Sequence, residues 1–204
     1  MANEWSADFI QWFGQSKVVD HLNKPRLVFH GTTSPIQVFS YKRQGFGSTV
    51  LGNYEIERYG IFAAEDPELA RWYMNQGEDF DIPGGSIMPL YLKIESPLDT
   101  VNGRYTDKLF ENIEQLVNSN PLAKTEYDGY RTARLLGDKW ADNQIWTLFD
   151  ADEYNEPEFW INLFKQLGYD GIKLRERIPG DMHKDSWAAF DPCQVKSAYD
   201  KHTQ

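Results

Sequence analysis

The chain has 204 residues, of which 41% are hydrophobic and 15% aromatic, and this composition predicts one globular domain with a substantial apolar core. A formal net charge of −10 argues against an extended nucleic-acid interface, because such an interface holds backbone phosphates with clustered Lys and Arg. Cys193 is the only cysteine and no apolar run approaches the ~18 residues of a membrane span, so we expect no disulfide, no metal site and no membrane partner.

The first elements are predicted to be a helix and a strand. Residues 1–22 show apolar residues at helical spacing behind Ser6, a candidate cap, and no basic segment precedes an uninterrupted apolar run. We therefore expect no cleaved leader, and either a cytoplasmic chain or one delivered into a host cytoplasm. A buried strand over 26–30 follows, since "RLVFH" is rich in β-branched and aromatic residues and closes at Gly31. The segment 40–60 has no clear period and is predicted as loop with some extended pieces.

The rest of the chain is predicted to run from strand to helix and back to strand. "GIFAA" indicates a short strand, and a helix starts behind Asp66 and ends near Gly77. A half-buried strand over about 90–94 precedes a helical insertion over 105–168. Two strands, "YDGIKLRE" and "SWAAFDPCQVKSAY", close the sequence on either side of a polar loop. This order predicts an α+β fold in a single domain over 1–204, rather than alternating βαβ units.

The first candidate site residue is His30, at the end of the first predicted strand. Gly31 follows it, and glycine permits the close backbone approach that a ligand beside a strand edge requires. Thr32 and Thr33 come next, and their hydroxyls are equally suited to bond their own backbone in a turn. A histidine in this place is compatible both with ligand binding and with a purely structural role.

Three segments in order resemble the signatures of the ADP-ribosyltransferase fold, in its diphtheria-toxin-like and poly(ADP-ribose) polymerase-like branch. They are "VFHGTT", "GIFAAEDPELARWYM" and "KDSWAAFDPCQVKSAYD". The last segment, with "LGYDGIKL" before it, also resembles phage-associated ADP-ribosyltransferase domains of the polyvalent-protein type. The resemblance spans roughly residues 30–198 and leaves the helical middle unmatched. It implies an ADP-ribosyltransferase-like split β-sandwich with a helical insertion.

The resemblance also implies an activity: NAD-dependent mono-ADP-ribosyl transfer to a protein target, with release of nicotinamide. Phe62 takes the place of the family's signature tyrosine and Tyr73 matches its second tyrosine, so the two rings would flank the nicotinamide. His30 would bond the adenosine-side ribose, the Gly31 backbone would clasp the carboxamide, and Thr32 would add a hydroxyl. The further NAD-binding candidates are Gly60, which opens the second segment, and Arg43, which with Lys42 and Arg58 could hold the pyrophosphate.

One departure from the family pattern concerns catalysis. The position of the family's catalytic glutamate falls on Ser186, and a serine can bond a ribose hydroxyl but cannot neutralise the positive charge that grows on the ribose. Asp185, Asp181 and Glu176 could supply this charge. We favour Asp185 or Asp181, and Asp185 serves only if the strand begins after it, because adjacent strand residues point to opposite faces. The catalytic candidates are therefore His30, Ser186, Asp185 and Asp181.

Other functions stay open from the sequence. The missing glutamate is compatible with a catalytically degenerate module that binds NAD or ADP-ribose, and water as the acceptor would make the protein an NAD glycohydrolase. RNA 2′-phosphotransferases share the fold, but they need a basic pocket that the acidic balance disfavours. The loop over 175–185 is either a protein-contact surface or an ordinary connection. We expect the aromatic residues of the helical insertion, including Trp140, Trp146, Phe149, Phe159 and Trp160, in the core rather than on a docking face.

Overall fold

The protein is described from a computed structural model. The described residues are 5–33, 36, 39, 42–49, 52–75, 83–102, 107–135, 150–151, 157–178 and 182–199. Among them, no helix is both long and apolar enough to cross a membrane.

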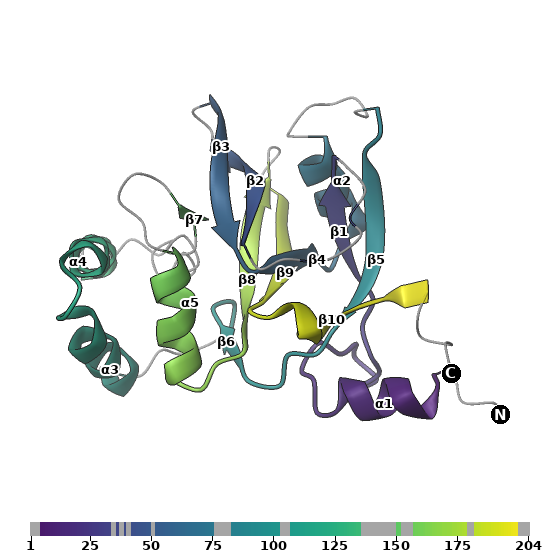
Figure 1. The fold of residues 1–204 in the computed structure, drawn as a ribbon, viewed down its shortest axis with the longest axis horizontal. Coiled ribbons are helices and arrows are strands. Elements are labelled where there is room, and N and C mark those ends of the chain that lie inside the picture. Colours follow the sequence, from purple (N-terminus) through teal and green to yellow (C-terminus); the bar gives the residue numbers. More distant parts are fainter. Residues whose placement is uncertain are drawn as a thin grey trace.

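A seven-stranded mixed sheet forms the centre of the fold (Figure 1). Its strands are β1 (Val28–Thr32), β4 (Ile61–Ala64), β5 (Ser86–Leu92), β6 (Pro97–Asp99), β8 (Gly171–Ile178), β9 (Met182–Ala189) and β10 (Val195–Ser197). The spatial order is β10-β5-β1-β4-β9-β8-β6, with only the β6–β8 pair parallel. Strands from both ends of the chain therefore meet at the centre of the sheet, and together with the five α-helices of the described residues this confirms the α+β class.

A smaller sheet corrects the prediction for the segment 40–60. β2 (Lys42–Thr49) and β3 (Gly52–Tyr59) form an antiparallel hairpin, and β7 (Asp150–Ala151) pairs with the outer edge of β3. The hairpin strands pair over their whole length, from Lys42 opposite Tyr59 to Thr49 opposite Gly52. Backbone hydrogen bonds between the two strands define them. Their sequence is rich in glycine and charged residues, so it shows no alternation of apolar and polar residues from which strands could be predicted.

The N-terminal helix is shorter than predicted. α1 covers Ala7–Phe13, with Ser6 as its cap, and it ends at Gly14, whose φ of 57° a glycine adopts without strain. The chain then turns to the sheet, where the Ser16 hydroxyl donates to the carbonyl of Leu92 at 2.8 Å. The first strand is also shifted, because β1 runs past Gly31 to Thr32 and places His30 within the strand rather than at its end.

At residues 90–92 both faces of β5 are buried, whereas the sequence predicted a half-buried strand there; residues 86–89 of β5 are exposed or half-buried. Leu90 and Leu92 lie in the cluster between β1, β4 and β9, and Tyr91 on the opposite face packs on α1. The Tyr91 ring meets that of Phe9 edge-on at 4.9 Å between centroids. The amphipathic helix α1 thus covers the outer face of a strand for which the sequence shows only one apolar face.

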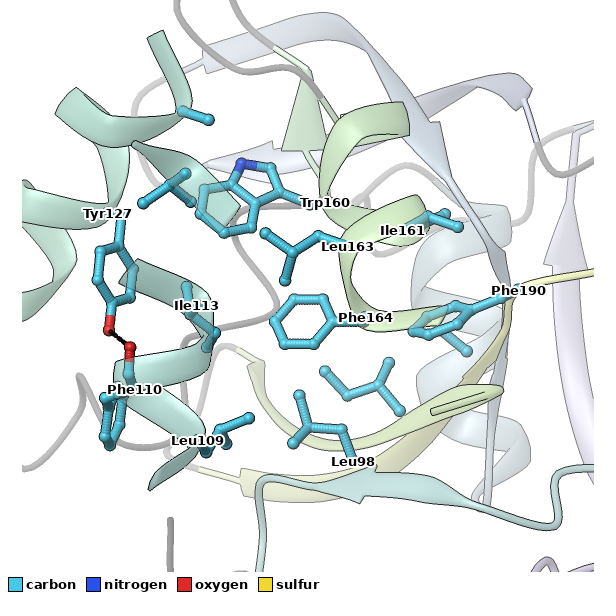
Figure 2. Packing of buried hydrophobic residues seen from close by; sticks show 14 of the residues in the cluster. Leu98, Leu109, Phe110, Ile113, Tyr127, Trp160, Ile161, Leu163, Phe164 and Phe190 are labelled. Carbon is cyan, nitrogen blue, oxygen red and sulfur yellow. Dashed lines mark hydrogen bonds between the residues drawn. The ribbon is translucent and has the colours of Figure 1, made fainter. Parts of the chain in front are cut away.

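Helices of the insertion form the largest apolar cluster. They are α3 (Asp107–Val117), α4 (Pro121–Leu135) and α5 (Pro157–Gln166), which lie together at the end of the sheet that carries β6 and β8 (Figure 1). Figure 2 shows their buried side chains pointing toward one another, with Phe164 of α5 among them. Trp160 and Ile113 are fully buried here, which confirms a core role for Trp160; Phe159 is half-buried. Trp140, Trp146 and Phe149 lie outside the described residues.

Helix α2 (Pro67–Met74) packs on β1 and β5 and is tied to β9 at its first turn. Asp66 caps it as predicted, accepting a hydrogen bond from the Glu68 N–H at 2.8 Å, and also accepts one from the Lys184 ammonium. The Lys184 bond lowers the pKa of Asp66, and the Asp66 bond raises the pKa of Lys184. A carboxyl whose pKa is lower in the folded state adds stability above its ordinary pKa, and acid removes this contribution.

Lys184→Met is expected to lower the urea midpoint at neutral pH, because it removes the cation that pairs with Asp66. The difference in midpoint between variant and wild type should become smaller as the pH falls below about 4, since carboxyls then protonate and the wild type loses the pair as well. Urea unfolding from neutral pH to the lowest pH at which the wild type folds measures this. Lys124→Met is the matched control, because Lys124 pairs with Asp128 on the exposed side of α4 and such pairs contribute little. A difference that stays undiminished in acid would contradict the linkage.

Candidate functional site

The three signature segments lie on adjacent strands. β1 carries the first, β4 begins the second and β9 carries the third, and these strands are neighbours in the order β1-β4-β9. Phe29 lies opposite Ala64, and Ala64 lies opposite Ser186. Segments separated by more than 150 residues of sequence are thus side by side, and their side chains share one region of the sheet.

β1 and β4 part just beyond this row. Within the described strands they pair at Phe29 and Ala64 alone. At the next residue of β1 a side-chain contact replaces the backbone pairing: Nδ1 of His30 lies 2.6 Å from the carbonyl oxygen of Phe62. A carbonyl oxygen only accepts, so Nδ1 carries the proton and donates. In the neutral ring, Nε2 is then an acceptor. The edge of the Phe39 ring contacts this imidazole at 5.6 Å between centroids and restricts its orientation.

Gly31 lies directly under α2. A Cβ on Gly31 would be 1.9 Å from the carbonyl oxygen of Ala70 and 3.0 Å from the Met74 nitrogen, so only glycine lets the helix backbone approach the strand this closely. Thr32, the last residue of β1, is buried. The first signature is therefore held between β5 on one side and α2 above it.

The position of the family's glutamate is buried and polar. Ser186 is 1% exposed, and its hydroxyl has no hydrogen-bond partner among the described residues. Alternation along β9 places it on the face that carries Ala188, which packs against Leu174 and the helical cluster. A buried hydroxyl left without a partner costs free energy, and a ligand hydroxyl is one way to satisfy it.

Asp185 lies on the opposite face of β9. The strand begins at Met182, before Asp185, so the condition under which Asp185 would share the face of Ser186 is not met. Its carboxylate accepts a hydrogen bond from Arg175 at 2.6 Å and lies 3.6 Å from the Lys173 ammonium. The Asp185 bond raises the pKa of Arg175. Two cations neutralise this carboxylate on a face where Trp187 is its neighbour along the strand.

A different carboxylate shares the face of Ser186. Glu176 on β8 is only 4% exposed, and its Oε2 accepts a hydrogen bond from the Tyr73 hydroxyl of α2. The sequence held a signal for this position, because Ile172, Leu174 and Glu176 alternate and the period of a strand places all three on one apolar face. A carboxylate at the third of these inward positions is rare unless it is paired or used.

The remaining candidates are placed less fully. Gly60 is buried in the turn between β3 and β4, where its φ of 103° favours glycine. Phe62 and Tyr73 are both half-buried, on β4 and α2. Arg43 lies on β2 opposite Arg58, but its side chain is outside the described part of the structure, and so is Asp181. The structure thus places Phe62, Ser186 and α2 on one face of the sheet. His30 alternates with Phe29 and Gly31 onto the other face, opposite Met88 of β5, and contacts the Phe62 backbone through its ring. The pyrophosphate candidates stay predictions.

Comparison with known protein families gives a match over most of the chain. The family model for ADP-ribosyltransferase in polyvalent proteins matches residues 20–204, which include the three signature strands and the helical insertion between them. No curated protein matches the chain, and no solved structure does. The match confirms the resemblance seen in the sequence and extends it to the helical middle. The chain therefore belongs to the ADP-ribosyltransferase family found in polyvalent proteins.

Proposed function

We propose that the protein is an NAD-dependent mono-ADP-ribosyltransferase that modifies a protein target. The observation that carries the proposal is the buried Ser186 hydroxyl, which lacks a partner among the described residues at the position of the family's glutamate. A ribose hydroxyl of NAD would supply the missing hydrogen bond there. The site lies where β1 and β4 part, beside the bond from His30 to Phe62.

The residues of the first signature would bind the two ends of NAD. Nε2 of the neutral His30 ring would accept a hydrogen bond from a hydroxyl of the adenosine-side ribose, since Nδ1 donates to the Phe62 carbonyl. The Gly31 amide and carbonyl would hold the nicotinamide carboxamide, which needs one donor and one acceptor in fixed positions. Thr32 would add a hydroxyl contact.

Aromatic and basic residues would hold the rest of the substrate. The rings of Phe62 and Tyr73 would flank the nicotinamide, and such a ring contact contributes about 0.5–1.5 kcal/mol beyond the buried area. Phe62 keeps the face of the family's tyrosine without its hydroxyl. Gly60 would leave room beside β4, and Arg43 would bind pyrophosphate oxygens through its planar guanidinium group.

In the reaction, the bond between C1′ of the ribose and the nicotinamide nitrogen breaks, and its electron pair leaves with nicotinamide. A side-chain nucleophile of the target bonds to C1′ and releases its proton to solvent. Positioning of the two reactants and electrostatic stabilisation of the cationic ribose would carry the catalysis. The serine at the glutamate position supports transfer of a single ADP-ribose rather than chain elongation.

The test is incubation of the protein with labelled NAD and a cell lysate, with nicotinamide release followed in parallel. We expect labelled protein bands together with nicotinamide, and we expect both to be lost in His30→Ala and retained in His21→Ala, a histidine in an exposed turn. Nicotinamide without labelled protein would show an NAD glycohydrolase. NAD binding without either product would show a binding module and overturn the enzyme proposal.

A further inference from the structure

We propose that Glu176, on the strand next to Ser186, is the catalytic carboxylate that takes the place of the family's glutamate. The inference rests on the proposed function and names a residue for the charge that Ser186 cannot supply. It also replaces the expectation that Asp185 or Asp181 does so.

The register places Glu176 diagonally across from Ser186. Leu174 lies opposite Ser186 and Glu176 lies opposite Lys184, so Glu176 is two residues along β8 from the partner of Ser186. Diagonal neighbours on antiparallel strands are about 7–8 Å apart, which long side chains bridge. A ligand hydroxyl bonded by Ser186 is therefore within range of a glutamate carboxylate on the same face.

The bond from Tyr73 orients this carboxylate. Tyr73 is the aromatic residue that matches the family's second tyrosine, and its hydroxyl donates to Oε2 of Glu176. A carboxylate accepts on two oxygens, and the bond from Tyr73 fixes the position of one of them and so orients the group. The ring proposed to stack on nicotinamide thus also positions the proposed acid beside the C1′ carbon.

The burial of Glu176 is costly for a residue with a purely structural role. It is 4% exposed and continues the inward alternation of Ile172 and Leu174, where an apolar residue would cost nothing to bury. Moving a carboxylate out of water is unfavourable even when it is hydrogen-bonded. Asp185, by contrast, faces away from Ser186 and is neutralised by Arg175 and Lys173.

The carboxylate would act on the charge that develops as nicotinamide leaves. When the C1′ bond breaks, the electron pair goes to nicotinamide and the ribose becomes cationic. A fixed negative charge in a buried site stabilises this state more strongly than it stabilises bound NAD. Glu176 would therefore contribute to turnover and little to NAD affinity, which separates it from a residue that only binds.

The test is the kinetics of Glu176→Gln, which keeps the shape of the side chain and its ability to accept from Tyr73 while removing the charge. We expect nicotinamide release to fall in kcat by about 100-fold or more, the size seen when a charge-stabilising group is removed, with the Kd for NAD little changed. Glu111→Gln, on the exposed side of α3, is the control and should match the wild type. Tyr73→Phe keeps the ring and should lower kcat more than it raises KM.

Restoring the acid at the family position provides the decisive variant. Glu176→Gln combined with Ser186→Glu should regain activity, whereas Asp185→Asn should leave kcat near the wild-type value. Wild-type kcat in folded Glu176→Gln would overturn the inference and leave the proposed function intact, while an inactive wild type would overturn both. Urea midpoints check folding; if Glu176→Gln unfolds, an unchanged kcat in both Glu176→Asp and Tyr73→Phe overturns the inference instead.

Discussion

Gly31→Ala is expected to abolish nicotinamide release and to lower the stability of the whole domain. The added methyl group would lie 1.9 Å from the carbonyl oxygen of Ala70, and a backbone atom of a packed helix cannot rotate away as a side chain can. Either α2 lifts from β1 or the strand shifts, and forced overpacking of this kind costs about 1–3 kcal/mol or more. Urea unfolding gives the loss of stability, and nicotinamide release gives the loss of activity.

Gly129→Ala is the matched control for this substitution. Gly129 lies on the exposed side of α4, and nothing lies within 4 Å of the position where its Cβ would be. Alanine is the better helix former, so this variant should gain about 0.5–1 kcal/mol and keep its activity. A Gly31→Ala protein as stable as the wild type would show that α2 does not lie on the strand at this distance.

Trp160→Ala is expected to have the largest effect on stability. The ring is fully buried in the cluster shown in Figure 2, and its indole N–H donates to Glu126 at 2.7 Å. Removal of a buried tryptophan ring costs about 3–5 kcal/mol, and loss of the N–H also removes a donor from Glu126. Phe159→Ala, at the half-buried neighbour on the same helix, should cost clearly less. Equal urea midpoints for the two variants would contradict this description of the core.

Much of the fold could be predicted from local patterns. The cap at Asp66 and the start of α5 at Pro157 follow from turn residues, and the structure has them there. The two closing strands were predicted with other bounds: β8 and β9 extend into the segment 175–185 that was predicted as a loop, and a short 3-10 helix, Pro192–Gln194, separates β9 from β10. Cross-strand pairing, which local patterns do not report, extends these strands into a polar sequence. The hairpin of β2 and β3 could not be predicted, because long-range register and not side-chain period defines it. The end of α1 at Gly14 was missed because the apolar pattern continues into a segment that packs on the sheet without helical structure.

The candidate site was predicted in its parts but not in its geometry. The resemblance implied one site for His30, Phe62 and Ser186. Their strands are neighbours in the sheet, but alternation along β1 places His30 on the other face from Phe62 and Ser186. Asp185 could share the face of Ser186 only if β9 began after Asp185, because adjacent residues within a strand point to opposite faces. The sequence alone left the start of β9 open. The pairing of β8 with β9 runs from Met182 onward, so Asp185 is within the strand and faces away from Ser186.

The attachment of α2 has a consequence for motion. Its first turn is bonded to Lys184 of β9 and its last turn, through Tyr73, to Glu176 of β8, so both ends of the helix are fastened to the same hairpin. Elements joined in this way open and close as a single cooperative unit rather than one by one. The helix that covers Gly31 and the paired strands β8 and β9 should therefore share one protection level in amide hydrogen exchange, so that a ligand bound under the helix raises protection in both strands as well.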